Sequence, residues 1–167
     1  MIQSFLNEGQ YKKNYTIITG ASHGLGKALA SESAANGRHL ILLALPGSGL
    51  EGTAKYIREN NYTEVLTYEL DLTNEQALYD FHNWIITNKY GVDALINNAG
   101  TGGSIPYAEA LADYLNNIIL PNIRALTIVT RLFISELKKH DHSAILNVSG
   151  MAAFRMFQRE LTVSHEI

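Results

Sequence analysis

The sequence contains no cysteine and only three prolines, and none of its apolar runs is long. Without cysteine there can be no disulfide scaffold, no thiolate zinc site and no cysteine nucleophile. A membrane-spanning helix needs about 18 consecutive apolar residues, and because no such run occurs we expect no membrane span. The first 14 residues include Glu8, Lys12 and Lys13 and lack the apolar segment of a signal peptide. We therefore expect a soluble, cytoplasmic protein.

Charge is also scarce: 17% of the residues are charged and the formal net charge is −3. This balance gives no general attraction to nucleic acid or to an anionic membrane, so neither is expected as a partner.

The His-Asp-His run at 140–142, with Glu136 one helical turn earlier, is the strongest candidate for a metal site. Two or three ligands at a helix end do not close such a site. A solvated helix terminus, in which the dipole favours the cations Lys138 and Lys139, explains the run better, and no metal is expected.

What the sequence does have is a regular alternation of apolar runs and amphipathic stretches. Strands are expected at 15–19, 39–44, 64–70, 93–97 and 143–148, and helices at 25–35, 50–60, 74–87 and 107–139. Apolar strands that alternate with helices form βαβ units with right-handed crossovers. The pattern therefore predicts one domain over 1–167 of the α/β class, a three-layer, doubly wound parallel sheet of Rossmann-like type. Pro121 lies inside the last helical stretch and predicts a kink there, with irregular backbone beside Asn122.

A glycine-rich turn joins the first expected strand to the first helix. It reads Thr19-Gly20-Ala21-Ser22-His23-Gly24-Leu25-Gly26. Glycines allow a tight turn and a close approach of the backbone to a pyrophosphate, and the free N–H groups and dipole of the following helix favour the phosphate charge. A simple loop is the poorer interpretation, because the turn lies where a doubly wound sheet binds a dinucleotide.

The spacing T-G-x-x-x-G-x-G resembles that of the short-chain dehydrogenase/reductase family, and four further matches follow in order. They are Asp71-Leu72 after the third strand, Asn97-Asn98-Ala99-Gly100 at the end of the fourth, Asn122 in the long helix, and Ser149 at the end of the fifth strand. The resemblance covers about nine-tenths of the chain. It implies an oxidoreductase that transfers a hydride between the nicotinamide of NAD or NADP and a carbonyl or alcohol substrate.

The resemblance also implies residue roles. Ser149 would orient the substrate oxygen, and Asn122 would hold a structural water and the catalytic lysine. The cofactor would lie on Thr19, Gly20, Ser22, His23, Gly24, Leu25, Gly26, Leu45, Asp71, Leu72, Asn98, Ala99 and Gly100, with Asp71 beside the adenine. Asn116, Asn117 and the 101–105 loop would border the pocket. The family implies a homodimer or homotetramer, and the many apolar residues of 108–139, which cover more than one helical stripe, suit a two-fold contact.

The cofactor type is the least determined of these expectations. An acid after the second strand would bind the ribose 2′-hydroxyl of NAD, and an arginine would accept the 2′-phosphate of NADP. Leu45 stands at that position and does neither, and the ring of His23 either approaches a 2′-phosphate or lies in solvent. The missing acid tilts the expectation toward NADP. It also argues against a methyltransferase, which usually places an acid there.

The family's tyrosine and lysine are absent. The family places a tyrosine about thirteen residues past the serine and a lysine four residues later; here Thr162 and Glu166 stand there, and no tyrosine or lysine follows Ser149. A threonine is too weak an acid to replace a phenol. Either the chain is altered and binds cofactor without catalysis, or an internal segment is missing between Ser149 and Leu161. We favour a missing segment because 157–161 resembles the helix that follows the lysine. The domain would then be incomplete after about residue 150, without its C-terminal strands. Two consecutive residues within 154–157 would lie much farther apart than about 3.8 Å.

Overall fold

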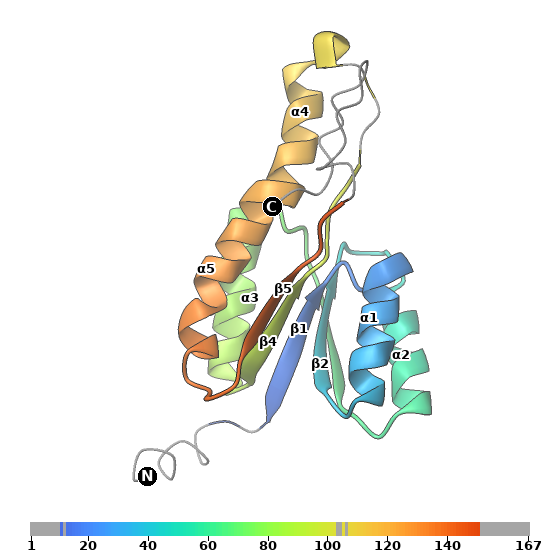
Figure 1. The fold of residues 1–167 in the computed structure, drawn as a ribbon, viewed down its shortest axis with the longest axis vertical. Helices are drawn as coiled ribbons and strands as arrows, with labels where there is room; N and C mark the ends of the chain where they lie inside the picture. The colour runs from blue at the N-terminus through green and yellow to red at the C-terminus, as the bar shows by residue number, and fades with distance from the viewer. Residues whose placement is uncertain (1–10, 12, 103–104, 106, 151–167) are drawn as a thin grey trace.

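A computed structural model describes residues 11, 13–102, 105 and 107–150 (Figure 1). It contains one sheet of five parallel strands in the order β3-β2-β1-β4-β5. The strands are β1 (Asn14–Thr19), β2 (His39–Ala44), β3 (Val65–Glu69), β4 (Gly91–Asn97) and β5 (Ala144–Asn147). The helices are α1 (Gly24–Ala35), α2 (Leu50–Asn60), α3 (Glu75–Thr87), α4 (Ala112–Ile119) and α5 (Leu126–Leu137), with a 3₁₀ turn η1 (Tyr107–Glu109) and a π-helical segment η2 (Leu120–Ala125). The predicted doubly wound α/β fold is confirmed.

Helices cover both faces of the sheet, α1 and α2 on one side and α3 and α5 on the other (Figure 1). Successive strand residues point to opposite faces, so Ile17 joins the core under α3 and α5 while Ile18 joins the core under α1 and α2. This two-sided burial explains the continuous apolar run of β2, in which Leu40 to Leu43 are all fully buried.

The long helical region differs from the expectation at its start. Helix α4 begins at Ala112 rather than near residue 107, because Leu111 is extended (φ −74°, ψ 156°) and separates the helix from η1. The predicted irregularity at Pro121 is present and takes the form of a π-helical segment. A π turn accommodates a residue that cannot donate a backbone hydrogen bond. The irregular backbone surrounds Asn122, as the sequence predicted.

The stretch Ala112–Leu137 is long and apolar enough, by length and composition alone, to cross a membrane, and 28% of its most apolar 18-residue window is buried. The expectation of no such stretch, which considered only uninterrupted apolar runs, did not anticipate it. In the structure α5 packs against β4 and α3 through Val129, Phe133 and Leu137, which are buried in the core. A mostly buried core helix of a soluble protein satisfies the same length and composition criterion, whereas this window is 28% buried.

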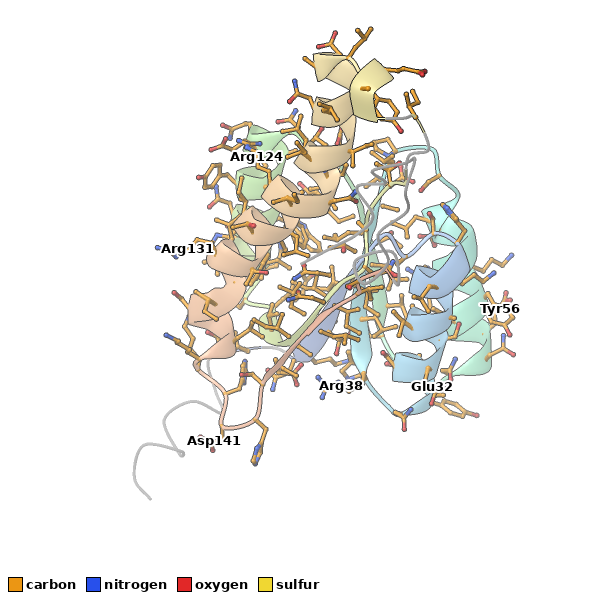
Figure 2. The ribbon with its side chains drawn as sticks, turned by 45° about the horizontal axis from the view of Figure 1, so that its top comes forward. Glu32, Arg38, Tyr56, Arg124, Arg131 and Asp141 are labelled. Atoms are coloured by element: carbon orange, nitrogen blue, oxygen red, sulfur yellow. The ribbon has the colours of Figure 1, made fainter. Side chains whose placement is uncertain are left out.

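The two ends of the sheet carry different features. The carboxyl ends of the strands lead to the glycine-rich turn and the loops beside it, whereas Arg38 and Asp141 lie at the opposite end (Figure 2). There Arg38 binds Asp93 at 2.6 Å and Thr16 Oγ1 at 3.0 Å, which ties β2 to β4 across β1. The predicted gap within 154–157, and the positions of Thr162 and Glu166, fall outside the residues that the structure describes.

Candidate functional site

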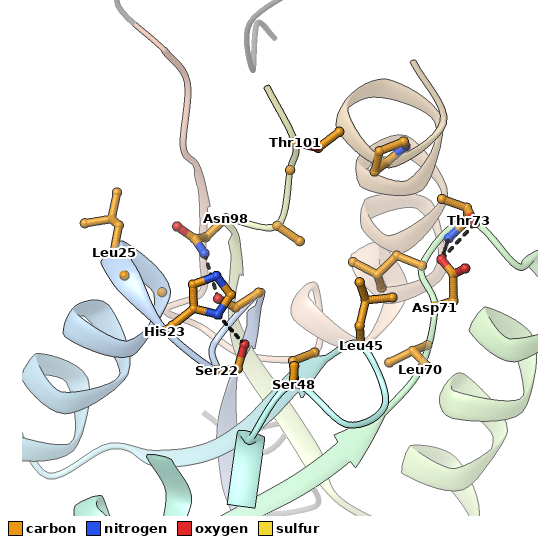
Figure 3. A pocket seen from close by; sticks show the side chains of 18 of the residues that line it. Ser22, His23, Leu25, Leu45, Ser48, Leu70, Asp71, Thr73, Asn98 and Thr101 are labelled. Carbon is orange, nitrogen blue, oxygen red and sulfur yellow. Dashed lines mark hydrogen bonds between the residues drawn. The ribbon is translucent and has the colours of Figure 1, made fainter. Parts of the chain in front are cut away.

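An open pocket of about 570 Å³ lies at the carboxyl ends of the strands (Figure 3). It is centred where the chain order reverses between β1 and β4, which is the usual ligand position in a doubly wound sheet. All the predicted cofactor-binding residues except Thr19 line it, together with Ala44, Ser48, Leu70, Thr73, Thr101, Asn117, Leu120 and Pro121. Its walls expose apolar side chains: Leu25 is 55% exposed and Leu45 58%. A ligand with a flat apolar part would cover this surface.

The glycines of the turn have different physical reasons to be glycine. Gly20 and Gly24 have positive φ angles of 67° and 55°, which side chains rarely adopt. Gly26 is limited by space instead: a Cβ atom there would overlap the carbonyl oxygen of Gly20 and lie 2.5 Å from Asn98 Nδ2. Gly26 therefore lets α1 pack closely against the turn, and a side chain at this position would displace the protein's own backbone.

The start of α1 leaves hydrogen-bond donors for a ligand. Its first backbone donors have no intrahelical acceptor, as at every helix start. The N-cap residue His23 caps none of them with its side chain, and the first turn contains no acid. The first helical bond is donated by Lys27 N–H to the His23 carbonyl. Free N–H groups and the helix dipole at the wall of a pocket can bind an anion.

Thr19 is buried and fastens the turn from below. Its Oγ1 accepts hydrogen bonds from the backbone N–H groups of Asn98 and Ala99, both at 2.9 Å. Asn98 Nδ2 in turn donates to the carbonyl oxygens of Thr19 and Gly20, at 2.9 and 3.3 Å. The end of β4 therefore fixes the glycine-rich turn, which gives Thr19 a structural position behind the pocket wall.

Asp71 lines the pocket, but one oxygen of its carboxylate is already engaged. Oδ1 accepts from the backbone N–H and the hydroxyl of Thr73, both at 2.8 Å. This local turn fixes the loop after β3, in which Leu72 and Thr73 also line the pocket. Arg124 holds the same loop from η2, with an ion pair to Glu75 and a 3.5 Å hydrogen bond to the Thr73 carbonyl (Figure 2).

Ser22 and His23 form a hydrogen-bonded pair on the wall, with 2.8 Å between Ser22 Oγ and His23 Nδ1 (Figure 3). The backbone of Ser22 is held by Thr53 of α2, whose buried hydroxyl donates to the Ser22 carbonyl at 2.7 Å. Because its backbone is fixed by α2 and its hydroxyl meets His23, Ser22 holds the imidazole at one end of the pocket.

The two predicted catalytic residues, Asn122 and Ser149, are not among the lining residues. Asn122 is buried and bridges η2 to the β4 loop: its Nδ2 donates to the Thr101 carbonyl at 2.7 Å and its Oδ1 accepts from the Thr101 N–H at 2.8 Å. Ser149 is exposed and follows β5, whose end is held by the Val148 N–H on the Asn97 carbonyl at 2.9 Å.

The sequence analysis assigned no individual role to three residues that support or line the pocket. Asn97 was noted only as part of a motif, yet its buried Nδ2 donates to Thr130 Oγ1 at 3.0 Å and to Asn147 Oδ1 at 2.8 Å, joining β4, α5 and β5. Thr53 of α2 supports the pocket wall through the Ser22 carbonyl, and Ser48, in the turn before α2, lines the pocket. The Pro-Gly-Ser-Gly turn after β2 was a signal for Ser48, whereas a lone helix threonine gave none for Thr53. Of the predicted border residues, Asn117 and Thr101 line the pocket and Asn116 does not.

No tyrosine is among the residues that line the pocket. Tyr15, a strongly perturbed phenol, lies in the core at the far end of β1, where burial raises its pKa well above the ordinary value. The pocket within the described part of the chain therefore offers backbone donors, hydroxyls, amides, one imidazole and one carboxylate.

A family model described as short chain dehydrogenase matches residues 14–161. The very-long-chain 3-oxoacyl-CoA reductase of Vanderwaltozyma polyspora is 34% identical over 128 residues, which are 74% of this chain and 36% of that protein. A short-chain dehydrogenase from Sphingobium yanoikuyae in complex with NADPH superposes with a TM-score of 0.75 at 27% identity, over 84% of this chain and 55% of that one.

The fold also matches L-sorbose reductase from Gluconobacter frateurii complexed with NADPH and L-sorbose, with a TM-score of 0.82 at 24% identity. That match covers 90% of this chain and 57% of the reductase. The chain thus spans between about a third and little more than half of the length of these three proteins.

Proposed function

The chain belongs to the short-chain dehydrogenase family, and from this premise we propose that it is the cofactor-binding part of an NAD(P)-dependent oxidoreductase. The observation that carries the proposal is the pocket itself. Glycine-imposed backbone, free helix-start donors and exposed leucines meet at one strand end. The glycine-imposed backbone and the free helix-start donors suit the pyrophosphate of a dinucleotide, and the exposed leucines suit its apolar surfaces.

Each wall of the pocket would bind one part of the cofactor. The N–H groups at the start of α1 would hold the pyrophosphate, and Asn98 would keep the turn in shape beneath it. The loop from Asp71 to Thr73 would border the adenine, because it leaves β3 on the adenosine side of the sheet. Ala99, Gly100 and Thr101 would border the nicotinamide ribose, and Asn122 positions that loop through its two bonds to Thr101.

The bound nicotinamide supplies a hydride donor or acceptor for a carbonyl or alcohol carbon. In this proposal the Ser149 hydroxyl orients the substrate oxygen, with its strand end held by Asn97 and Asn147. Proton transfer needs a stronger acid than a serine or threonine hydroxyl, and the sequence offers no tyrosine after Ser149. In this proposal the proton donor is a tyrosine of the internal segment that we expect to be missing after Ser149.

We propose NADP as the preferred cofactor. Leu45 provides no carboxylate to bind a ribose 2′-hydroxyl, so the feature that usually selects NAD is missing. The related protein from Sphingobium yanoikuyae was solved with NADPH. Ser22, His23 and Ser48 are neutral polar side chains that line the pocket near Leu45.

The proposed function is tested by titrating the chain with NADPH and NADH and following the fluorescence of the nicotinamide. Saturable binding with tighter affinity for NADPH is expected. Absence of binding by both at millimolar concentration would overturn the proposal.

The intact mass of the protein from its natural source distinguishes an active oxidoreductase from a protein that only binds the cofactor. A mass above that of the printed sequence, with Tyr-x-x-x-Lys found in the added peptide, is expected for the oxidoreductase. A mass equal to it would leave a cofactor binder without a proton donor.

We also propose a two-fold homo-oligomer through α4 and α5. Ile119 at the end of α4 is 40% exposed, and Leu111, which directly precedes α4, is 77% exposed although both are apolar, and exposed apolar surface of this kind marks a contact. Light scattering at micromolar concentration should give at least twice the monomer mass. A monomer that persists when the natural full-length protein is measured would contradict this assembly.

A further inference from the structure

Two walls of the pocket come from segments that are far apart in the sequence. One wall is the loop 71–73 after β3, and another is the start of η2, where Leu120 and Pro121 line the pocket. The helical stretch of α4 and η2 lies between the loop 71–73 and Thr101 (Figure 3). Side chains of η2 that contact both neighbours therefore link two different parts of the same pocket.

Arg124 of η2 makes the contact with the loop after β3. Its guanidinium donates from Nη2 to the Glu75 carboxylate, in an ion pair, and from Nη1 to the Thr73 carbonyl at 3.5 Å (Figure 2). Glu75 is the first residue of α3, so the two acceptors lie on either side of the point where the loop enters the helix. An arginine suits this position because its planar fork presents separate N–H donors, whereas a lysine supplies a single point of charge.

Asn122, two residues earlier in η2, makes the contact on the other side. Its buried side-chain amide forms two hydrogen bonds with the backbone of Thr101, at 2.7 and 2.8 Å. Asn122 and Arg124 both belong to the π-helical segment, and π-helical turns are rare and frequently lie at functional sites. The two side chains thus join the loop at 71–73 to Thr101 through one short piece of backbone.

The Arg124–Glu75 pair contributes little to overall stability. The two side chains are 38% and 48% exposed, and exposed ion pairs are weak because water screens them and two long side chains must be ordered. The pair can nevertheless change local order. A ligand that orders the loop 71–73 also orders Arg124 and η2, so a second ligand beside Thr101 finds its wall already ordered. Shared ordering of this kind produces positive cooperativity without a change of shape.

We propose that Arg124 is a positioning residue that couples the two ends of the cofactor pocket, so that binding at the loop 71–73 strengthens binding at Thr101 and the reverse. The proposal rests on the proposed function, which places the adenine at the first loop and the nicotinamide ribose at the second. Arg124 is not among the residues that line the pocket, so it acts through Thr73, Glu75 and the backbone of η2. The coupling is reciprocal, because each ligand changes the affinity for the other by the same factor.

Two fragments of the cofactor measure this coupling. Adenosine covers the end at 71–73 and nicotinamide mononucleotide the end at Thr101, and neither contains the complete pyrophosphate. NMR titration of the full chain gives the dissociation constant of nicotinamide mononucleotide without adenosine and with a saturating amount. In the wild type adenosine should tighten binding about threefold, a factor within the reach of an exposed ion pair. Adenosine alone should also slow solvent exchange of the Thr101 N–H, which donates to Asn122 Oδ1.

Substitutions at the ion pair separate coupling from support. Arg124→Met removes the charge and both donors but keeps a long side chain, and should bring the ratio of the two constants to about one. A purely structural role would weaken each fragment by itself and leave that ratio unchanged. Arg124→Lys keeps the charge without the fork and should retain part of the coupling. Adding Glu75→Gln to Arg124→Met should change the ratio no further, because both residues act through one contact.

Arg131→Met is the matched control, because Arg131 is an exposed arginine of α5, and it should keep the wild-type ratio. If NADPH and both fragments fail to bind, the proposed function fails and the coupling with it. If NADPH binds but either fragment does not, or adenosine leaves the affinity for nicotinamide mononucleotide unchanged, the coupling is refuted while the proposed function stands. A wild-type ratio in Arg124→Met would refute the coupling in the same way.

Discussion

Strands β2 and β5 flank the central pair β1 and β4, yet they are covered to very different degrees. From Leu40 to Leu43, β2 is fully buried, whereas every residue of β5 is exposed and Leu146 retains 47% of its surface. The β2 side has strand neighbours on both edges and helices on both faces. In the described part of the chain β5 pairs with β4 alone. The β2 side of the pocket is thus fully packed, while the Ser149 side is anchored by a few hydrogen bonds.

This contrast bears on function. A pocket wall built on packed strands holds its donors in place before a ligand arrives, which lowers the ordering cost of binding. The glycine-rich turn has such a base in Thr19, Asn98 and Thr53. Ser149 depends on Asn97, Asn147 and the backbone of Val148. Dinucleotide binding is therefore the property that the described residues can support by themselves.

Matched leucine truncations on the two sides should show the largest difference. Leu42→Ala opens a cavity in the core under α1 and α2, and should cost about 2–5 kcal/mol in the free energy of unfolding. Leu146→Ala removes a side chain that is already half exposed, and should cost less than about 1 kcal/mol. Urea denaturation followed by circular dichroism measures both. Equal losses would show that β5 is as well covered as β2.

A side chain at Gly26 should damage the packed side locally. Gly26→Val places atoms on the Gly20 carbonyl and Asn98 Nδ2, so the turn must move, at a cost of about 1–3 kcal/mol in stability. NADPH affinity should fall at least about tenfold, because the distorted turn forms part of the pocket wall. Gly52→Ala is the control, because a Cβ there meets nothing within 4 Å. It should leave affinity unchanged, and wild-type affinity in Gly26→Val would disprove the role of the turn.

Removing the side chain that ties the end of β4 to the turn after β1 should have an intermediate effect. Asn98→Ala leaves the carbonyl oxygens of Thr19 and Gly20 without their donor, which should cost about 1–3 kcal/mol. Calorimetry with NADPH should show a weaker affinity, since the turn loses its tie to β4. Asn83→Ala, on α3 and away from the pocket, is the matched control and should bind normally. An unaltered affinity and stability in Asn98→Ala would mean that β4 does not support the turn.

The smallest effect concerns pH. Burial lowers the pKa of His82, which packs against Phe133 between α3 and α5. Because the folded state binds the proton less readily than the unfolded state, stability should be lost as the pH falls below the ordinary histidine pKa of about 6.5. His82→Gln should flatten that part of the profile in thermal denaturation between about pH 5 and 7. If His82→Gln keeps the wild-type dependence of stability on pH, the loss of stability at low pH belongs to another titratable group.

Local sequence patterns predicted the fold well because β2 and the helices carry unambiguous periodicity. The glycine-rich turn, together with the resemblance to the short-chain family, also indicated which residues would line one pocket. The start of α4 was wrong, because an extended Leu111 looks no different from a helical leucine in sequence. The ties made by Thr53, Thr130 and Arg124 were missed because each joins segments far apart in the chain. The proposed roles of Ser149 and Asn122 stay predictions.

The central claim is that the chain binds NADP in the pocket at the strand ends, and backbone NMR of the ¹⁵N-labelled chain tests it most directly. On titration with NADP⁺, the amide shifts should change within the segments 20–26, 45–48 (where Pro46 has no amide proton), 71–73 and 98–101, with smaller changes elsewhere. The amides of Arg38 and Asp141, at the opposite end of the sheet, serve as internal references and should stay constant. Saturable changes confined to those four segments would establish the site. Changes centred on any other surface, or none at millimolar NADP⁺, would contradict the account.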